Sequence, residues 1–205
     1  MTGASGMAYA ADLLACLRQA EVRTHLIVTS GAKRVIPTEL DGGLEVLSSL
    51  ADVVHKDSDN GAPIASGSHR FGAMAVVPCS AGTLAKVARG MTDNLTSRAA
   101  HVALKERRPL VLVVREAPYS RPMLENMLAA DAAGALVMPA SPGFYHRPAD
   151  IHGLIGSVTA RVLDHLGVAH DRVPRWGDAP RAAASPPWWP PPARARGWAR
   201  GPRLT

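Results

Sequence analysis

Hydrophobic and polar positions along the chain follow two alternating periods, and this alternation predicts a parallel α/β protein. Short apolar runs, typical of strands covered on both faces, alternate with stretches whose apolar residues recur at helical spacing. The predicted strands are Thr24–Thr29, Ala73–Pro78, Leu110–Val114 and Ala135–Met138. The predicted helices are Met7–Gln19, Thr83–Arg89, Asn94–Arg107, Leu124–Ala133 and Asp150–Leu166. Gly43–Ser68 is less regular, and we expect loops around the site there.

The length and charge of the chain fit one ordinary domain and argue against a nucleic-acid binder. Its 205 residues, 47% of them hydrophobic, can bury a sizeable core. The formal net charge is +6, but five arginines and one aspartate lie from Gly177 onward. The remainder carries a net charge of only about +2, so a nucleic-acid role would rest on the last residues alone.

Cysteines and apolar runs give no sign of a metal site, a disulfide framework or a membrane anchor. Cys16 and Cys79 lie in unrelated segments without Cys-x-x-Cys spacing, and we interpret both as small buried hydrophobic residues. No apolar run approaches the ~20 residues that span a bilayer, and the N-terminus lacks the pattern of a signal peptide. We therefore expect a cytoplasmic protein that holds no metal.

Basic residues surround the strand Leu110–Val114 and predict an anion site. Arg115 and Glu116 follow this strand at its carboxyl end, where ligands bind in open α/β sheets. A charge directly after five apolar strand residues needs an anionic partner, such as Glu116 or a bound phosphate. Arg98 and Lys105 are seven residues apart on one predicted helix and therefore share a face, although such charges usually form a solvated surface.

Two short turns before helices could bind a phosphate through backbone N–H groups and hydroxyls. They are Gly3-Ala4-Ser5-Gly6 and Ser80-Ala81-Gly82-Thr83. Each signal is weak alone, and Ser80 without context is an ordinary helix N-cap. Glu39, which follows a short helix, would alone be interpreted as a solvated surface acid.

The two ends of the sequence depart from the parallel α/β pattern. In a doubly wound fold a Gly-rich turn follows a strand, whereas this sequence opens directly on Met1-Thr2-Gly3. We therefore expect the first strand to be truncated, through a wrongly chosen start codon or a fragment. The clustered prolines after Gly177 prevent a helix or central strand. We predict a domain over residues 1–177 and a disordered tail over residues 178–205, to which we assign no role.

Five sequence blocks, in order, resemble the flavin prenyltransferases (UbiX-type), within the wider flavoprotein and cysteine-decarboxylase fold family. They are Gly3-Ala4-Ser5-Gly6, Pro78-Cys79-Ser80 with Thr83-Leu84-Ala85, Leu104–Leu112 (LKERRPLVL) with Arg115-Glu116-Ala117-Pro118, Glu125-Asn126-Met127, and Pro142-Gly143-Phe144-Tyr145-His146. The resemblance covers about residues 1–177. It implies a three-layer, Rossmann-like (flavodoxin-like) parallel sheet with helices on both faces.

The resemblance also implies a flavin mononucleotide (FMN) site and a site for dimethylallyl phosphate. The FMN-binding residues would be Gly3, Ala4, Ser5, Thr29, Ser80, Ala81, Gly82, Thr83 and Arg98. The phosphate of dimethylallyl phosphate would be surrounded by Lys105, Arg115, Tyr145 and Arg161. The catalytic residues would be Ser5, Glu39, Lys105 and Glu116.

The reaction implied by the resemblance joins a dimethylallyl group to N5 and then C6 of reduced FMN and releases phosphate, without a metal. Cationic side chains would stabilise the charge that gathers on the leaving phosphate. The resemblance further implies a homo-oligomer, a dodecamer with sites between subunits. Its product, prenylated FMN, would serve a UbiD-type decarboxylase.

Three residues depart from the family pattern. Thr29 stands where a serine is usual, and it keeps the hydroxyl. His101 replaces a usual aspartate and Thr96 a common leucine, which puts the packing of their helix in doubt. Two alternatives stay open: an FMN-dependent cysteine decarboxylase, and a non-catalytic FMN-binding remnant.

Overall fold

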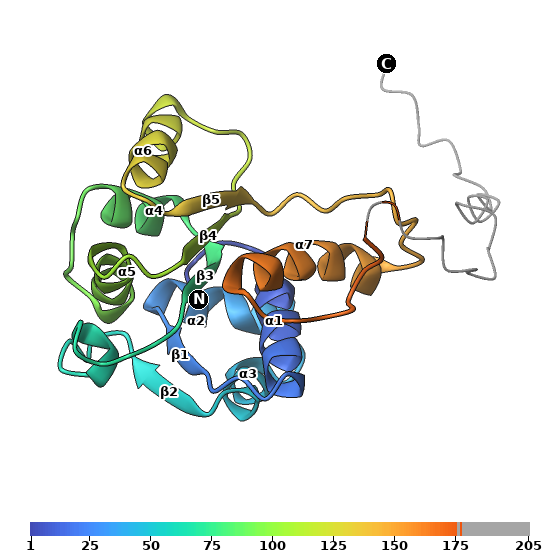
Figure 1. Cartoon of the computed structure of the whole chain (residues 1–205), viewed down its shortest axis with the longest axis horizontal. Helices are drawn as coiled ribbons and strands as arrows, with labels where there is room; N and C mark the ends of the chain where they lie inside the picture. The colour runs from blue at the N-terminus through green and yellow to red at the C-terminus, as the bar shows by residue number, and fades with distance from the viewer. Residues whose placement is uncertain (176, 178–205) are drawn as a thin grey trace, which may run out of the picture.

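The computed structural model describes residues 1–175 and 177, and it has parallel strands with helices packed on both sides (Figure 1). Its strands are β1 (His25–Val28), β2 (Val53–Lys56), β3 (Met74–Cys79), β4 (Leu110–Val114) and β5 (Leu136–Pro139). Its helices are α1 (Met7–Gln19), α2 (Ser30–Glu39), α3 (Gly43–Leu50), α4 (Ala81–Ala88), α5 (Leu95–Lys105), α6 (Arg121–Ala132), α7 (Ile151–Leu166) and the short 3-10 helix η1 (Pro63–Ala65). The tail that we predicted over residues 178–205 lies outside the described residues.

The expected order of strands and helices is confirmed, with one error. The prediction of loops over Gly43–Ser68 is wrong, because α3, β2 and η1 lie there. The sequence signal is weak since β2 has only four residues, half-buried and exposed in alternation, and α3 buries only Leu47 fully. Helix α6 also begins earlier than predicted, with Pro122 in its first turn, a position that proline favours.

The strand β4 is the centre of the core. All five of its residues are buried, and they alternate between two hydrophobic clusters. Val111 and Val113 pack with α1 and the end of α7, whereas Leu110, Leu112 and Val114 pack with α4, α5 and α6. Helices α1 and α7 lie side by side on one face (Figure 1). This arrangement confirms the expected sheet covered on both faces.

The sheet is interrupted between β1 and β3. Strands β1 and β2 form one parallel pair, while β3, β4 and β5 form a second parallel sheet in that order. Met1 and Thr2 lie in the gap between them. The Met1 nitrogen donates to the Ile27 carbonyl at 2.7 Å, the Thr29 amide donates to the Met1 carbonyl at 3.2 Å, and the Thr2 amide donates to the Pro78 carbonyl at 3.2 Å.

Candidate active site at the carboxyl ends of the strands

Three turns meet at the carboxyl ends of the strands, and each turn leads into the N-terminus of a helix. The segment after Thr2 leads through Gly6 into α1, Thr29 follows β1 and caps α2, and Ser80 follows β3 and caps α4. The Thr29 hydroxyl accepts from the Ala32 amide at 3.1 Å, and the Ser80 hydroxyl accepts from the Thr83 amide at 3.4 Å. Parallel strands bring these helix N-termini to one edge of the sheet, where they favour an anion.

Thr2 ties the first turn to the third. Its side chain is fully buried; its hydroxyl donates to the Pro78 carbonyl at 2.8 Å and accepts from the Ser80 amide at 2.7 Å. The turn before α1 is therefore held directly against the end of β3.

Gly3 and Gly31 hold the first turn against the second. A Cβ atom on Gly3 would lie 2.9 Å from the Gly31 Cα atom, and a Cβ on Gly31 would lie 3.0 Å from the Gly3 Cα. Real Cβ atoms almost never show the first of these distances, and the second is shorter than nine in ten real Cβ contacts. Both positions therefore need glycine, because the two backbones touch here.

Glu39, the last residue of α2, caps α1. Its carboxylate accepts hydrogen bonds from the backbone amides of Gly6 and Met7, each at 2.8 Å. Burial alone would raise the pKa of Glu39, but hydrogen bonds from Ser5, Met7 and Gly6 and the nearby charge of Arg115 outweigh it and lower the pKa. The carboxylate therefore stays ionised and holds the turn that contains Ser5.

The N-termini of α2 and α4 keep free donors. Within the part of the chain that the structure describes, the backbone amides of Ser30, Gly31, Ala81 and Gly82 have no hydrogen-bond acceptor. A Cβ added at Gly82 would meet no atom within 4 Å, so open space lies above this turn. Four unpaired donors beside open space fit the phosphate of a mononucleotide such as FMN.

Arg115 does not pair with Glu116, one of the two anionic partners that the sequence suggested for it. Both side chains are exposed, and no ion pair joins them among the described residues. The chain leaves β4 at Val114, so the next residues already extend past the covered sheet. Arg115 instead lies near Glu39 and Tyr9, whose pKa values respond to its charge. It thus borders the turn before α1.

Lys105 lies before the amino end of β4, at the edge of the sheet opposite to Arg115. It ends α5 and pairs with Glu106, five residues before β4 begins, whereas Arg115 follows β4. A strand of five residues is about 16 Å long, so the two backbones are separated by that strand. The structure of one chain therefore does not bring Lys105 beside Arg115. Arg98, exposed in the first half of α5, donates to the Ala65 carbonyl at 3.2 Å.

Tyr145 and Arg161 belong to the last part of the domain. Tyr145 is 82% exposed in the segment between β5 and α7. Arg161 lies on α7, where it donates to the Asp164 carboxylate at 2.8 Å, and its side chain is 60% exposed. Both side chains thus reach the outer surface of the chain.

The residues that depart from the family pattern fit their helix. Thr96 is buried, and its hydroxyl donates to Asp57 at 2.6 Å, so the doubt about its packing is removed. His101 is exposed. Cys79 is fully buried and burial raises its thiol pKa to about 12, while Cys16 is half-buried; both are free.

Sequence reasoning missed Thr2, Gly31 and Tyr9. Thr2 directly precedes the Gly3 turn. Gly31 follows Thr29-Ser30, and a glycine in a short turn after a predicted strand was the signal that could have identified it. Tyr9 carried no signal, since it lies at an ordinary helix position near Arg115.

The described residues contain neither a membrane-spanning helix nor a metal-binding cluster. Their helices include none long and apolar enough to cross a membrane. No group of three or more His, Cys, Asp or Glu side chains in the described ranges is arranged to hold a metal ion.

Comparisons with known proteins identify the family of the chain. A model of the Flavoprotein family matches residues 1–145, which defines the class of the protein as a flavoprotein. The flavin prenyltransferase UbiX of Deinococcus radiodurans is 61% identical over 176 residues, covering 86% of this chain and 90% of that protein. The chain therefore belongs to the family of UbiX-type flavin prenyltransferases.

Solved structures confirm the fold. The crystal structure of AnUbiX in complex with FMN and dimethylallyl pyrophosphate matches with a TM-score of 0.85 at 42% identity, covering 87% of this chain and 95% of that one. A dodecameric FMN-dependent UbiX-like decarboxylase from Escherichia coli O157:H7 matches with a TM-score of 0.84 at 43% identity, covering 87% and 97%. The FMN-dependent cysteine decarboxylase TvaF, at 19% identity and a TM-score of 0.55 over 80% and 93%, shares the fold alone.

Proposed function

We propose that this chain transfers a dimethylallyl group from dimethylallyl phosphate to N5 and C6 of reduced FMN. The observation that carries the proposal is the set of free amides at Ser30, Gly31, Ala81 and Gly82, beside the turn that Glu39 holds. The relationship to AnUbiX, whose structure contains FMN and dimethylallyl pyrophosphate, supports the choice of ligands. Reduced FMN, when bound, would supply the nucleophilic nitrogen and carbon.

The FMN site would be formed by the three turns. The backbone donors of α2 and α4 would bind the FMN phosphate, with Gly3, Ala4, Ser5, Thr29, Ser80, Thr83 and Arg98 around it. The close contact between Gly3 and Gly31 would keep these donors fixed. Backbone donors that are already fixed in place need no reorganisation when the ligand binds.

The two glutamates would have different roles. Glu39 is ionised and already accepts two backbone hydrogen bonds, so it would hold the turn and orient Ser5. The Glu116 carboxyl is exposed and, among the described residues, accepts only from the neighbouring Ala117 amide at 3.1 Å. Glu116 is therefore the better candidate to carry protons between the reacting flavin atoms or the phosphate and solvent.

The leaving phosphate would meet cations from more than one copy of the chain. Arg115 borders the turn before α1, whereas Lys105 lies beyond the other end of β4. Arg161 and Tyr145 project from the outer surface. We propose that a second copy brings Lys105, Arg161 or Tyr145 to Arg115, so that together they stabilise charge on the phosphate.

A homo-oligomer, a dodecamer like the E. coli relative, is therefore part of the proposal. Large apolar side chains near the end of the domain are exposed, including Leu128, Phe144 and Ile151 at 71%, 57% and 72%. Such residues are common in interfaces between subunits. Light scattering coupled to gel filtration measures the number of copies, and a monomer with full activity would contradict a shared site.

The test is an anaerobic reaction of the purified protein with reduced FMN and dimethylallyl phosphate, followed by mass analysis of the released flavin. We expect the flavin to gain one C5 prenyl unit, and Lys105→Ala or Glu116→Gln to abolish the gain. A parallel reaction with dimethylallyl pyrophosphate identifies the donor. Unmodified FMN from a protein that binds it would overturn the proposal.

Two alternatives have their own outcomes in this test. A cysteine decarboxylase would release carbon dioxide from a peptide with a C-terminal cysteine and leave FMN unprenylated. A non-catalytic FMN-binding remnant would bind FMN without any change of its spectrum when the prenyl donor is added. For an active prenyltransferase, we further predict a cytoplasmic location and delivery of prenylated FMN to a UbiD-type decarboxylase.

A further inference from the structure

Asp164 lies on α7 and joins Arg161 to the segment that follows this helix. Its Oδ2 atom accepts a hydrogen bond from the Arg161 guanidinium at 2.8 Å. Its Oδ1 atom lies 2.6 Å from the Arg175 guanidinium and 3.2 Å from the His170 ring. Burial alone would raise the pKa of Asp164, but the hydrogen bonds and charges of Arg175 and His170 outweigh it and lower the pKa. The carboxylate therefore stays ionised between these groups.

The chain turns back along α7 after the helix ends. Gly167 terminates the helix in a left-handed conformation with φ of 72°. Further along, the Arg172 guanidinium binds the Asp12 carboxylate of α1. It also lies against Gly156 of α7, where an added Cβ atom would be 3.1 Å from the Arg172 Nε atom. The segment 168–175 is thus fixed to both helices, and it holds one oxygen of the buried carboxylate from a fixed position.

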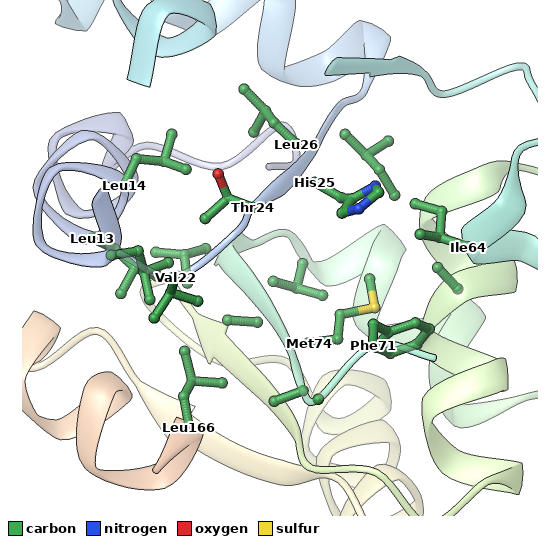
Figure 2. Close-up of a pocket in the computed structure, with 18 of the residues that line it drawn as sticks. Leu13, Leu14, Val22, Thr24, His25, Leu26, Ile64, Phe71, Met74 and Leu166 are labelled. Atoms are coloured by element: carbon green, nitrogen blue, oxygen red, sulfur yellow. The ribbon is translucent and has the colours of Figure 1, made fainter. Parts of the chain in front are cut away.

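Helix α7 is a rigid support for Arg161. The next two residues, Val162 and Leu163, are buried in the core. Leu166, in the last turn, lines an apolar cavity of about 520 Å³ together with Leu13 of α1 (Figure 2). The Arg161 side chain, in contrast, extends from this support toward solvent. A long exposed side chain keeps its rotamer freedom unless another group binds its end, and Asp164 is such a group.

The same helix also holds the segment that carries Tyr145. The Gly143 amide donates to the Ser157 hydroxyl at 3.1 Å. The Tyr145 ring lies over Gly143, where an added Cβ atom would approach the ring to 3.1 Å. Ser157 and Arg161 are four residues apart on α7 and therefore lie on one side of the helix. Tyr145 and Arg161 thus belong to one rigid unit of a single chain.

We propose that Asp164 is a positioning residue, which orients the Arg161 guanidinium toward the leaving phosphate of the prenyl donor while Arg175 offsets its negative charge. This inference rests on the proposed function. A guanidinium has five N–H donors, so the bond from one Nη atom to Asp164 leaves others for phosphate oxygens. The two arginines carry two positive charges against one negative charge, and the group remains cationic. A cation that is already oriented stabilises the developing charge without reorganisation.

An ordinary ion pair on a helix surface would not orient an arginine in this way. Exposed pairs of this kind hold their side chains weakly. The pair of Arg121 and Glu125 on α6 is an example, because its side chains are 91% and 52% exposed. The Asp164 side chain is only 18% exposed, and Arg175 holds its second oxygen. The pair on α6 therefore provides a matched control for the pair on α7.

The experiment is a double-mutant cycle on the chain of residues 1–205 in saturating FMN, with calorimetric titration of inorganic phosphate. Arg161→Ala should weaken phosphate binding about tenfold or more, because it removes hydrogen bonds to a charged ligand. Asp164→Ala should weaken it about threefold to tenfold, because Arg161 must then be immobilised by the ligand. The double variant should bind phosphate no more weakly than Arg161→Ala alone, since Asp164 acts through Arg161. Glu125→Ala should bind phosphate as the native protein does.

Melting temperatures identify the variants that fold, and Asp164→Asn, which keeps the shape of the side chain, replaces Asp164→Ala in the cycle if the alanine variant does not. In the prenylation reaction, the Asp164 variant should raise KM for dimethylallyl phosphate and leave FMN affinity unchanged. A further loss of phosphate binding in the double variant, native binding in the Asp164 variant, or no phosphate binding by the native protein overturns the proposal. A native protein that binds phosphate but prenylates no flavin contradicts the proposed function alone, because the titration needs no turnover.

Discussion

The carboxylate of Glu39 and the backbone amide of Gly6 lie 2.8 Å apart, and this hydrogen bond fixes the start of α1. Gly6 has a left-handed backbone with φ of 108° and offers no side-chain cap of its own. The cap thus comes from a residue 33 positions away. The end of α2 and the start of α1 are joined at the proposed flavin site.

Glu39→Ala should weaken both the fold and the binding of FMN. The change leaves the Gly6 and Met7 amides without an acceptor, at a cost of about 1–3 kcal/mol in the free energy of unfolding. Urea unfolding at pH 7 measures this loss, and fluorescence titration measures FMN affinity.

Glu39→Gln is the matched control, because its amide oxygen can still accept one of these bonds. We expect it to lose less stability than Glu39→Ala. Since the folded pKa of Glu39 is lowered, its ionised form stabilises the fold above the unfolded pKa, and this stabilisation disappears as the pH falls through the folded pKa. A Glu39→Gln protein as stable as the native one at pH 7, but not in acid, would contradict this assignment.

Gly31→Ala should displace the turn after β1. The added Cβ would approach the Gly3 Cα to 3.0 Å, so one of two backbones must move. We expect a lower melting temperature and at least about tenfold weaker FMN binding, because the free amides of α2 move with the turn.

Gly82→Ala provides the comparison for stability. A Cβ there meets nothing within 4 Å, and Gly82 lies in the first turn of α4. Replacing this glycine should leave the melting temperature unchanged or raise it slightly, since alanine restricts the unfolded chain. If both variants lose the same stability, the contact between Gly3 and Gly31 is not the cause.

Thr2→Val should separate the first turn from the third. Valine has nearly the shape of threonine but leaves the Ser80 amide without its 2.7 Å acceptor. The expected loss is about 1–3 kcal/mol in the free energy of unfolding. Thr2→Ser keeps the hydroxyl and should retain most of the stability, so a Thr2→Val protein as stable as Thr2→Ser would contradict this role of the hydroxyl.

Arg115→Ala should lower the turnover of prenyl transfer by about 100-fold to 1000-fold without affecting the fold. Arg115 is exposed, so its removal leaves the core intact, but it also removes a cation from the proposed phosphate site. Steady-state kinetics of flavin prenylation measure the change. Arg121→Ala removes an exposed arginine paired with Glu125 and should retain normal turnover. Normal turnover of Arg115→Ala would exclude Arg115 from the site.

The sequence predicted those features that depend on local patterns. Five consecutive apolar residues identified β4 as a covered strand, and Val111 and Leu112 indeed pack against opposite layers. Ser80 was recognised as a cap because its partner Thr83 is only three residues away. Such features need no knowledge of distant contacts.

Features that join distant segments could not be predicted in the same way. Gly3 meets Gly31, and Thr2 meets Ser80, only after β1 and β3 are placed in parallel. Helical spacing likewise put Arg98 and Lys105 on one face, but it gave no indication that β4 separates Lys105 from Arg115. Spacing along a helix shows which side chains share a face. The site depends instead on the edge of the sheet at which each residue lies.

Acid should destabilise the protein through a pair of stacked histidines. His25 and His55 are joined by a 2.9 Å hydrogen bond between ring nitrogens, with ring centroids 5.2 Å apart. Burial is the largest cause that lowers the pKa of each, and His69 lowers both further, whereas Asp52 and Asp59 oppose the shift. The unfolded chain therefore binds protons below about pH 6.5 that the folded chain does not. The free energy of unfolding should fall as the pH decreases from 6.5 through the folded pKa values.

His55→Gln tests this dependence because glutamine can bond to His25 but does not titrate. Urea unfolding between pH 5 and pH 8 should give a smaller slope for this variant than for the native protein in the range below pH 6.5. His101→Gln, which changes an exposed histidine, should keep the native slope. The buried Met1 amine adds a slope of the same sign between about pH 6 and pH 8, where stability rises with pH. A loss of stability confined to that higher range, unchanged by His55→Gln, would assign the acid sensitivity to Met1 instead of the histidine pair.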